Sequence, residues 1–130
     1  MSGMIPRTRR GAELLDRRVR RANAVTNTYG SLVAGRLIVY IEIFAVVGAG
    51  AITVTIQEKV PDSENTVNIL SSASLNSAGV TRLEVGPGIT VVANKSAAVH
   101  MGANYCISVA FSGSGSDSVE YQITAVEPTI

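Results

Sequence analysis

Short segments in which apolar and polar residues alternate recur along most of this chain, and they constrain its fold more than any other feature. In Ile52–Gln57, isoleucine and valine alternate with threonine and glutamine, which is the pattern of a strand with one buried side. Similar segments cover residues 37–43, 66–72, 80–85, 105–111 and 119–125. Turn signals such as Gly86-Pro87-Gly88 separate them. The sequence therefore predicts six or seven closely spaced strands.

The stretch from Leu37 to Ile56 is almost entirely apolar and is long enough to span a bilayer. Glu42 lies inside it, Gly48 and Gly50 interrupt it, and many of its residues are β-branched. These features favour strands over a membrane helix. We interpret the stretch as two strands joined at Gly48-Ala49-Gly50, and the short connection predicts a hairpin.

The length of 130 residues leaves room for one domain, and an apolar fraction of 46% is sufficient for a core. We predict an all-β fold over residues 36–130, either an antiparallel β-sandwich or a jelly-roll-like barrel. Residues 1–35 are predicted to form a basic N-terminal arm and linker, and we expect no secretory signal there. The single cysteine, Cys106, excludes an intrachain disulfide.

The N-terminal arm carries most of the positive charge. Residues 1–21 contain seven arginines against Glu13 and Asp16, a net charge of +5, whereas the remaining residues contain four basic against eight acidic side chains, a net charge of −4. The arginines are Arg7, Arg9, Arg10, Arg17, Arg18, Arg20 and Arg21. This asymmetry predicts that the arm binds a negatively charged partner, and screening over about 8 Å at physiological salt requires direct contact.

A short helix is predicted within the arm. In Gly11–Ala22, the residues Leu15, Val19 and Ala22 recur at helical spacing and form a narrow apolar stripe. A helix of about 12 residues is only marginally stable in water, so we expect it to be ordered only when it docks on a partner. The alternative interpretation is a solvated, disordered tail.

The pattern of reactive residues does not indicate an enzyme. His100 is the only histidine, and its spacing from Cys106 fits neither a metal site nor a cysteine–histidine nucleophile. Asp62 and Glu64 lie in a dense turn signal and are better interpreted as solvated than as an acid–base pair or a calcium loop. We therefore expect no catalytic residues, no metal and no cofactor.

Nucleic acid is a possible partner of the arm, because arginine density alone can neutralise phosphates. The arm before Tyr29 contains no aromatic residue, so it lacks a stacking platform for bases. Binding to a membrane surface is disfavoured, since the apolar stripe contains no Trp or Phe. A carbohydrate-binding sandwich would need an exposed aromatic cluster, and the chain has two Phe, four Tyr and no Trp.

Four segments of the body share a general pattern with one class of protein. They are Ile52–Lys59, Thr66–Ser74, Thr81–Gly88 and Tyr105–Ala110. Over residues 36–126 this strand pattern resembles the small β-sandwich structural proteins of tailed bacteriophages and prophages. The resemblance implies a non-enzymatic virion protein, either a capsid decoration or minor capsid protein, or a subunit of the neck or tail.

The resemblance also implies a protein lattice of the capsid or tail as the partner, with the virion as the destination and the host cytoplasm as the location before assembly. Only 16% of the residues are charged, which is low for a well-solvated monomer and indicates surface covered by neighbours. We therefore expect a homo-oligomer that binds the lattice through the arginines of the arm and one sandwich face. The alternative is a coat protein whose arm contacts packaged nucleic acid.

Overall fold

The computed structural model describes residues 12–29, 36–101 and 104–127. The described residues are all-β and contain no helix. Their strands are β1 (Ala12–Arg20), β2 (Ala24–Val25), β3 (Leu37–Val47), β4 (Ala51–Lys59), β5 (Thr66–Ser71), β6 (Gly79–Val85), β7 (Ser96–Ala97), β8 (Tyr105–Ser112) and β9 (Ser118–Val126).

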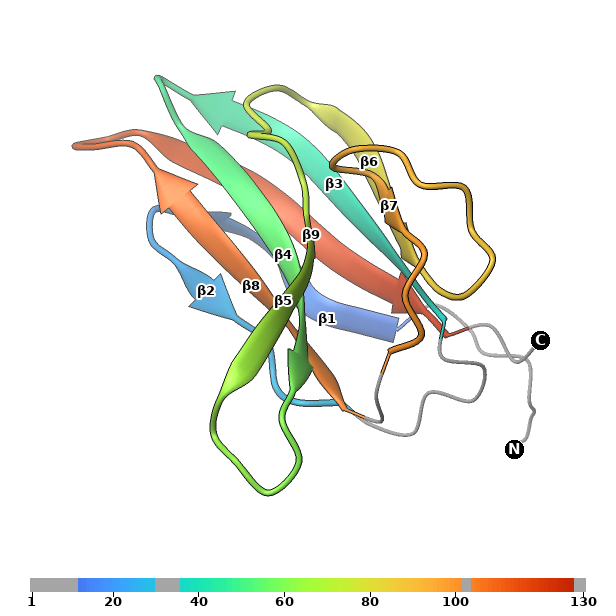
Figure 1. Cartoon of the computed structure of the whole chain (residues 1–130). Helices are drawn as coiled ribbons and strands as arrows, with labels where there is room; N and C mark the ends of the chain where they lie inside the picture. The colour runs from blue at the N-terminus through green and yellow to red at the C-terminus, as the bar shows by residue number, and fades with distance from the viewer. Residues whose placement is uncertain (1–11, 30–35, 102–103, 128–130) are drawn as a thin grey trace, which may run out of the picture.

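The strands form two sheets that pack face to face (Figure 1). Sheet A has the order β1-β9-β3-β6-β7, and sheet B has the order β2-β8-β4-β5. Neighbouring strands are antiparallel except for β6 and β7, which are parallel. The predicted β-sandwich is therefore confirmed, as are the six strands that the alternation indicated.

The core lies between the sheets and contains most of the residues that the alternation predicted as inward-facing. Of these, Phe111 is only partly buried, and the core also includes Leu14, Leu83, Val85 and Met101. The buried side chains include Leu37, Val39, Ile41 and Ile43 of β3, Ile52, Val54 and Ile56 of β4, Tyr105, Ile107 and Val109 of β8, and Val119, Tyr121, Ile123 and Ala125 of β9. Burying a side chain of this size contributes about 1.5–3 kcal/mol, so these four strands supply most of the hydrophobic stabilisation. Their outward residues are left to form the two outer faces of the sandwich.

The predicted helix in the arm is wrong, because residues 12–20 form strand β1. This strand pairs with β9 at the edge of sheet A, with two register shifts, one between Glu13 and Leu15 and one between Leu15 and Arg18. Next along the chain, β2 pairs with β8, and Tyr29 exchanges two backbone hydrogen bonds of 2.8 Å with Tyr105. Residues 12–29, assigned to the arm and linker by sequence, thus contribute strands to both sheets.

The predicted hairpin between residues 37 and 56 is also wrong. β3 belongs to sheet A and β4 to sheet B, so the turn at Gly48 and Gly50 crosses from one sheet to the other. Gly48 has a φ of 66°, and a Cβ there would lie 2.0 Å from the Asp117 carboxylate, which favours glycine at this corner. Within the described residues, no helix has the length and apolar character needed to cross a membrane.

Candidate partner-binding surfaces

The seven arginines predicted to bind a partner fall into two groups. Arg7, Arg9 and Arg10 lie outside the described residues. Arg17, Arg18 and Arg20 lie on strand β1, and the exposed Arg21 follows in the bend before β2. The structure therefore places the second group on the sandwich itself.

Arg17 connects three strands of sheet A. Its Nε lies 2.7 Å from a carboxylate oxygen of Glu120 on β9, and its guanidinium carbon lies 3.7 Å from the ring centroid of Phe44 on β3. A guanidinium over an aromatic ring is attracted by about 0.5–1 kcal/mol at an exposed site. Arg17 thus binds β1 to the sheet while its side chain remains 54% exposed.

Arg18 and Arg20 share the carboxylate of Asp16, at 2.9 and 3.0 Å. The hydrogen bond from Arg18 is the main cause that holds the pKa of Asp16 below its ordinary value, and the charge of Arg20 adds to it. Arg20 also donates to the carbonyl oxygen of Tyr121 at 3.3 Å and lies over its ring. These two arginines are therefore partly neutralised within the protein. Among the described residues, Arg21 forms no ion pair.

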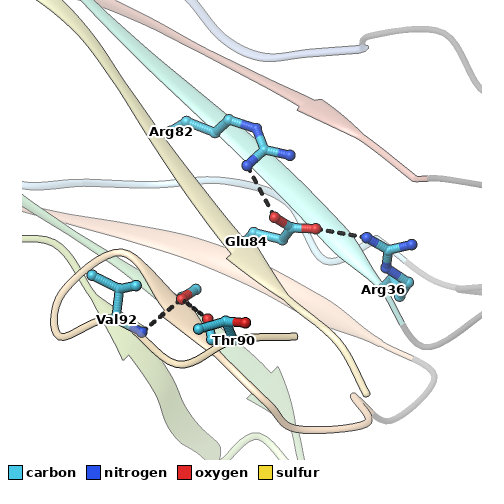
Figure 2. A network of polar contacts seen from close by, with 6 residues as sticks. Arg36, Arg82, Glu84, Thr90 and Val92 are labelled. Carbon is cyan, nitrogen blue, oxygen red and sulfur yellow. Dashed lines mark hydrogen bonds and ion pairs between the residues drawn. The ribbon is translucent and has the colours of Figure 1, made fainter. Parts of the chain in front are cut away.

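A second ion-pair network lies on the same sheet, between β3 and β6 (Figure 2). Glu84 accepts hydrogen bonds from Arg36 at 2.6 Å and from Arg82 at 2.9 Å. Burial acts to raise the pKa of Glu84, but the hydrogen bonds and charges of the two arginines outweigh it and hold the pKa below its ordinary value. A hydrogen bond with Tyr40 and the neighbouring Glu84 raise the pKa of Arg82. The charges of Glu84 and Arg82 therefore persist at neutral pH.

We call the outer side of sheet A the charged face. Its outward side chains come from β1, β3, β6 and β9 and include Arg17, Tyr40, Glu42, Phe44, Arg82, Glu84, Glu120, Gln122 and Thr124. Both aromatic residues of β3 have an arginine beside them, Arg17 at Phe44 and Arg82 at Tyr40. The face therefore does not present the bare aromatic platform on which a sugar ring would stack.

We call the outer side of sheet B the neutral face. Its outward side chains are arranged in rows across the strands, and the longest row consists of Val25, Ser108, Thr55 and Ser71. The adjacent rows are Ala110 with Thr53, and Cys106 with Gln57 and Asn68. None of these side chains is charged. Hydrogen bonds within the face join Thr55 to Ser71 at 2.8 Å and Gln57 to Asn68 at 2.9 Å.

The residues considered for catalysis are not brought together. Burial raises the pKa of the Cys106 thiol, so the thiolate that a nucleophile requires is disfavoured. His100 is exposed, and Glu64 pairs with Lys59 at 3.3 Å in the β4–β5 turn. The described residues contain no group of three or more His, Cys, Asp or Glu side chains that could hold a metal ion.

An open groove of about 420 Å³ lies beside the Glu84 network. Its lining consists of Arg82, Glu84, Ile89, Thr90, Val92, Lys95 and Ser96. The Ser96 hydroxyl holds residues 90–92 in place along one side of the groove. It accepts a hydrogen bond from the Val92 N–H at 2.8 Å and donates one to the Thr90 carbonyl oxygen at 2.6 Å. Two of the three charges of the groove, those of Arg82 and Glu84, are paired with each other, so a bound anion would have to compete with Glu84 for Arg82.

The sequence predicted that one sandwich face binds a partner but did not identify the face or its residues, although the signal for the charged face was present. Tyr40, Glu42 and Phe44 share one side of β3, opposite the buried residues, and this alternation marks them as outward. The partners of Arg17 and Arg36 could not be found in this way, since Glu120 and Glu84 lie 103 and 48 residues away. No family model, curated protein or solved structure matches this chain.

Proposed function

We propose that this chain is a non-enzymatic structural protein of a virion, in the first place a capsid decoration or minor capsid protein. It binds the protein lattice of the particle through its N-terminal arm and the charged face. A neck or tail subunit would use the same surface on a different lattice. The proposal explains the surface chemistry of the sandwich without requiring a catalytic site.

One observation supports this proposal most directly: β1, the strand formed by residues 12–20 of the arm, belongs to the same sheet as the charged face. β1 lies at the edge of sheet A, and Arg17 reaches from it across β9 to Phe44 on β3. A partner that covers the charged face therefore contacts the arm at Arg17.

The composition of the charged face also fits a protein partner. Arginine and aromatic residues are enriched at protein interfaces and at the positions that contribute most to binding. Here the guanidinium groups of Arg17 and Arg82 are already positioned by aromatic and acidic neighbours, and they remain 54% and 48% exposed. A preordered side chain loses less conformational entropy when a partner covers it.

Nucleic acid is the second candidate partner, as in the coat-protein alternative. Asp16 neutralises part of the charge of Arg18 and Arg20, so fewer arginines of the arm are free to contact phosphates than the sequence indicated. Binding to DNA with a steep salt dependence that the triple variant Arg7→Gln, Arg9→Gln, Arg10→Gln abolishes would favour this alternative over a protein lattice.

The proposal is tested by co-sedimentation of the full chain with particles of the virus whose genome encodes it. The double variant Arg17→Ala, Arg82→Ala is expected to lose at least about 10-fold in affinity, since removal of interface arginines commonly costs more than 1 kcal/mol each. Lys59→Ala, which removes a cation from the end of β4 in the other sheet, is the matched control and should bind like the wild type. Circular dichroism verifies that each variant is folded.

Two results would overturn the proposal. One is the absence of binding of the wild type to complete or partly assembled particles. The other is equal binding by the double variant and by Lys59→Ala, because the charged face would then play no part in the contact.

A further inference from the structure

We infer that the neutral face is the docking surface for a second copy of this chain, with two sandwiches packed face to face about a two-fold axis. The inference rests on the proposed structural function, and it adds the partner and the surface of self-association. Lattice binding and self-association then use opposite sides of the molecule, sheet A for one and sheet B for the other (Figure 1).

The two outer faces of the sandwich differ in charge. A sheet face in contact with water normally carries polar and charged residues, and the charged face follows this rule with Arg17, Glu42 and Arg82. On the neutral face, the outward positions of β4 and β8 from residues 51 to 57 and 106 to 112 are occupied by Ala, Thr, Gln, Cys and Ser. Lys59, the last residue of β4, is on the same side at the end of the face, and it is paired with Glu64 at 3.3 Å. Such a surface loses no ionic solvation when another protein covers it.

The polar groups of the neutral face are complementary to a second copy of the same face. A two-fold axis places a surface patch against the same patch of the second copy, so any charge near the axis would meet a like charge. The hydroxyl groups of Thr55 and Ser108 and the amide of Gln57 each contain both a donor and an acceptor. A face made of such groups is complementary to itself, whereas a charged partner would find no opposite charge on it.

The side chains of the neutral face are short and are already ordered by hydrogen bonds within the face. Thr55 and Ser71 hydrogen-bond at 2.8 Å, and Gln57 binds Asn68 at 2.9 Å. Alanine, serine and threonine lose little rotamer entropy on burial and allow two sheets to approach closely. At one end of the central row Val25 is 64% exposed, which provides apolar surface for the contact.

The available area fits only a weak, reversible dimer. Sheet B has two residues in β2, eight in β8, nine in β4 and six in β5, and at about 3.3 Å per residue and about 4.8 Å between strands they cover roughly 400 Å² in projection. This value is below the roughly 600–1,000 Å² per partner of standard interfaces and fits a weak, transient contact. We therefore expect a dissociation constant of about a few hundred micromolar.

Analytical ultracentrifugation of the full chain, from about 1 µM to about 500 µM, measures this equilibrium. Thr55→Lys places two lysines near each other across the axis and is expected to weaken dimerisation at least about 30-fold. The matched control is Thr124→Lys, the same substitution on an outward position of the charged face, and it should change the dissociation constant less than about threefold.

A second measurement does not depend on a lysine variant folding normally. Ala110→Cys in a Cys106→Ser background places an exposed thiol on the neutral face, and Gln122→Cys in the same background places one on the charged face. A short bismaleimide reagent is expected to cross-link the Ala110→Cys chain into dimers and to leave the Gln122→Cys chain monomeric.

The inference is overturned if the wild type remains monomeric, if Thr124→Lys weakens the dimer more than Thr55→Lys, or if only Gln122→Cys is cross-linked. These results are separable from the test of the proposed function. A monomer that co-sediments with particles would refute the neutral-face dimer and leave the lattice proposal standing. A neutral-face dimer that binds no particle would refute the lattice proposal alone.

Discussion

Replacing Glu84 with glutamine tests the stabilising role of the ion-pair network on the charged face. The Glu84 side chain is only 16% exposed, while its partners Arg36 and Arg82 are 35% and 48% exposed. Fully exposed ion pairs contribute about 0.2–1 kcal/mol, and hydrogen bonds to charged groups contribute about 1.5–3 kcal/mol when buried. We assign about 1 kcal/mol to the pair with Arg36 and about 0.5 kcal/mol to the more exposed pair with Arg82. Glu84→Gln should therefore lower the free energy of unfolding by about 1.5 kcal/mol at pH 7.

The effect should depend on pH in a defined direction. The pKa of Glu84 is lower in the folded protein than its ordinary value of about 4.3 in an unfolded chain. A group of this kind stabilises the fold fully above the unfolded pKa, and this stabilisation disappears as the pH falls through the folded pKa. Glutamine does not titrate, so the difference between wild type and variant should be complete above about pH 5 and should shrink below about pH 4.

Urea unfolding followed by circular dichroism, at equal protein concentration and at several pH values, measures both quantities. Glu42→Gln is the control, because Glu42 is exposed on the same face and has no ion pair with a described residue. The reasoning is refuted if Glu84→Gln and Glu42→Gln have the same effect at pH 7. It is also refuted if the Glu84→Gln deficit stays constant down to pH 3.

Three further tests address the core and the turns, each by urea unfolding at pH 7. Tyr121→Phe should change the stability by less than about 1 kcal/mol, because among the described residues the buried hydroxyl meets no donor or acceptor in good geometry and interacts only with the nearby guanidinium of Arg20. A loss above about 1 kcal/mol would show that the interaction with Arg20 is a full hydrogen bond. Gly48→Ala should lower the free energy of unfolding by about 2–3 kcal/mol, because the residue has a left-handed φ and the new Cβ would clash with Asp117. Gly115→Ala should lower it by only about 1 kcal/mol, because Gly115 has a similar φ of 61° but open space around it. Equal losses for the two variants would exclude the clash. Ile41→Ala should cost about 2–5 kcal/mol, and a loss below 1 kcal/mol would contradict its position in the centre of the core.

The core of the sandwich could be predicted from the sequence because the side-chain period of a strand is encoded locally. In β4 and β9 every second residue is apolar, and the structure buries those residues. Burial on one face and exposure on the other need no knowledge of which strand lies next to which. This explains why the alternation predicted the buried residues of these strands although it did not predict which strands pair.

Strand β1 was missed because its alternation is interrupted. The two register shifts on either side of Leu15 change which residues face inward, so within β1 only Leu14 is buried, with 9% of it exposed, and Val19 is 49% exposed. With the strand period broken, Leu15, Val19 and Ala22 matched a helix instead. What holds β1 in place is pairing with β9 and the contacts of Arg17 and Arg20, which involve residues about 100 positions away.

The connection at Gly48-Ala49-Gly50 shows that a local turn sequence does not determine which strands pair. A short glycine-containing turn permits either a hairpin within a sheet or a corner between two sheets, and the local sequence is the same for both. The choice is made by the neighbours of β3, which are β9 and β6, and these strands follow much later in the chain. The candidate surfaces depend on this choice, since it assigns the outward residues of β3 and β4 to opposite faces.

The position of β9 has a consequence for biosynthesis. This strand, last of the nine, lies between β1 and β3 in sheet A and hydrogen-bonds to both. Until the ribosome has released it, β1 has no neighbour and one edge of β3 is open, so the sheet cannot close during translation. A chain truncated before Ser118 would lack this strand, and the unpaired edges of β1 and β3 would make it prone to aggregation.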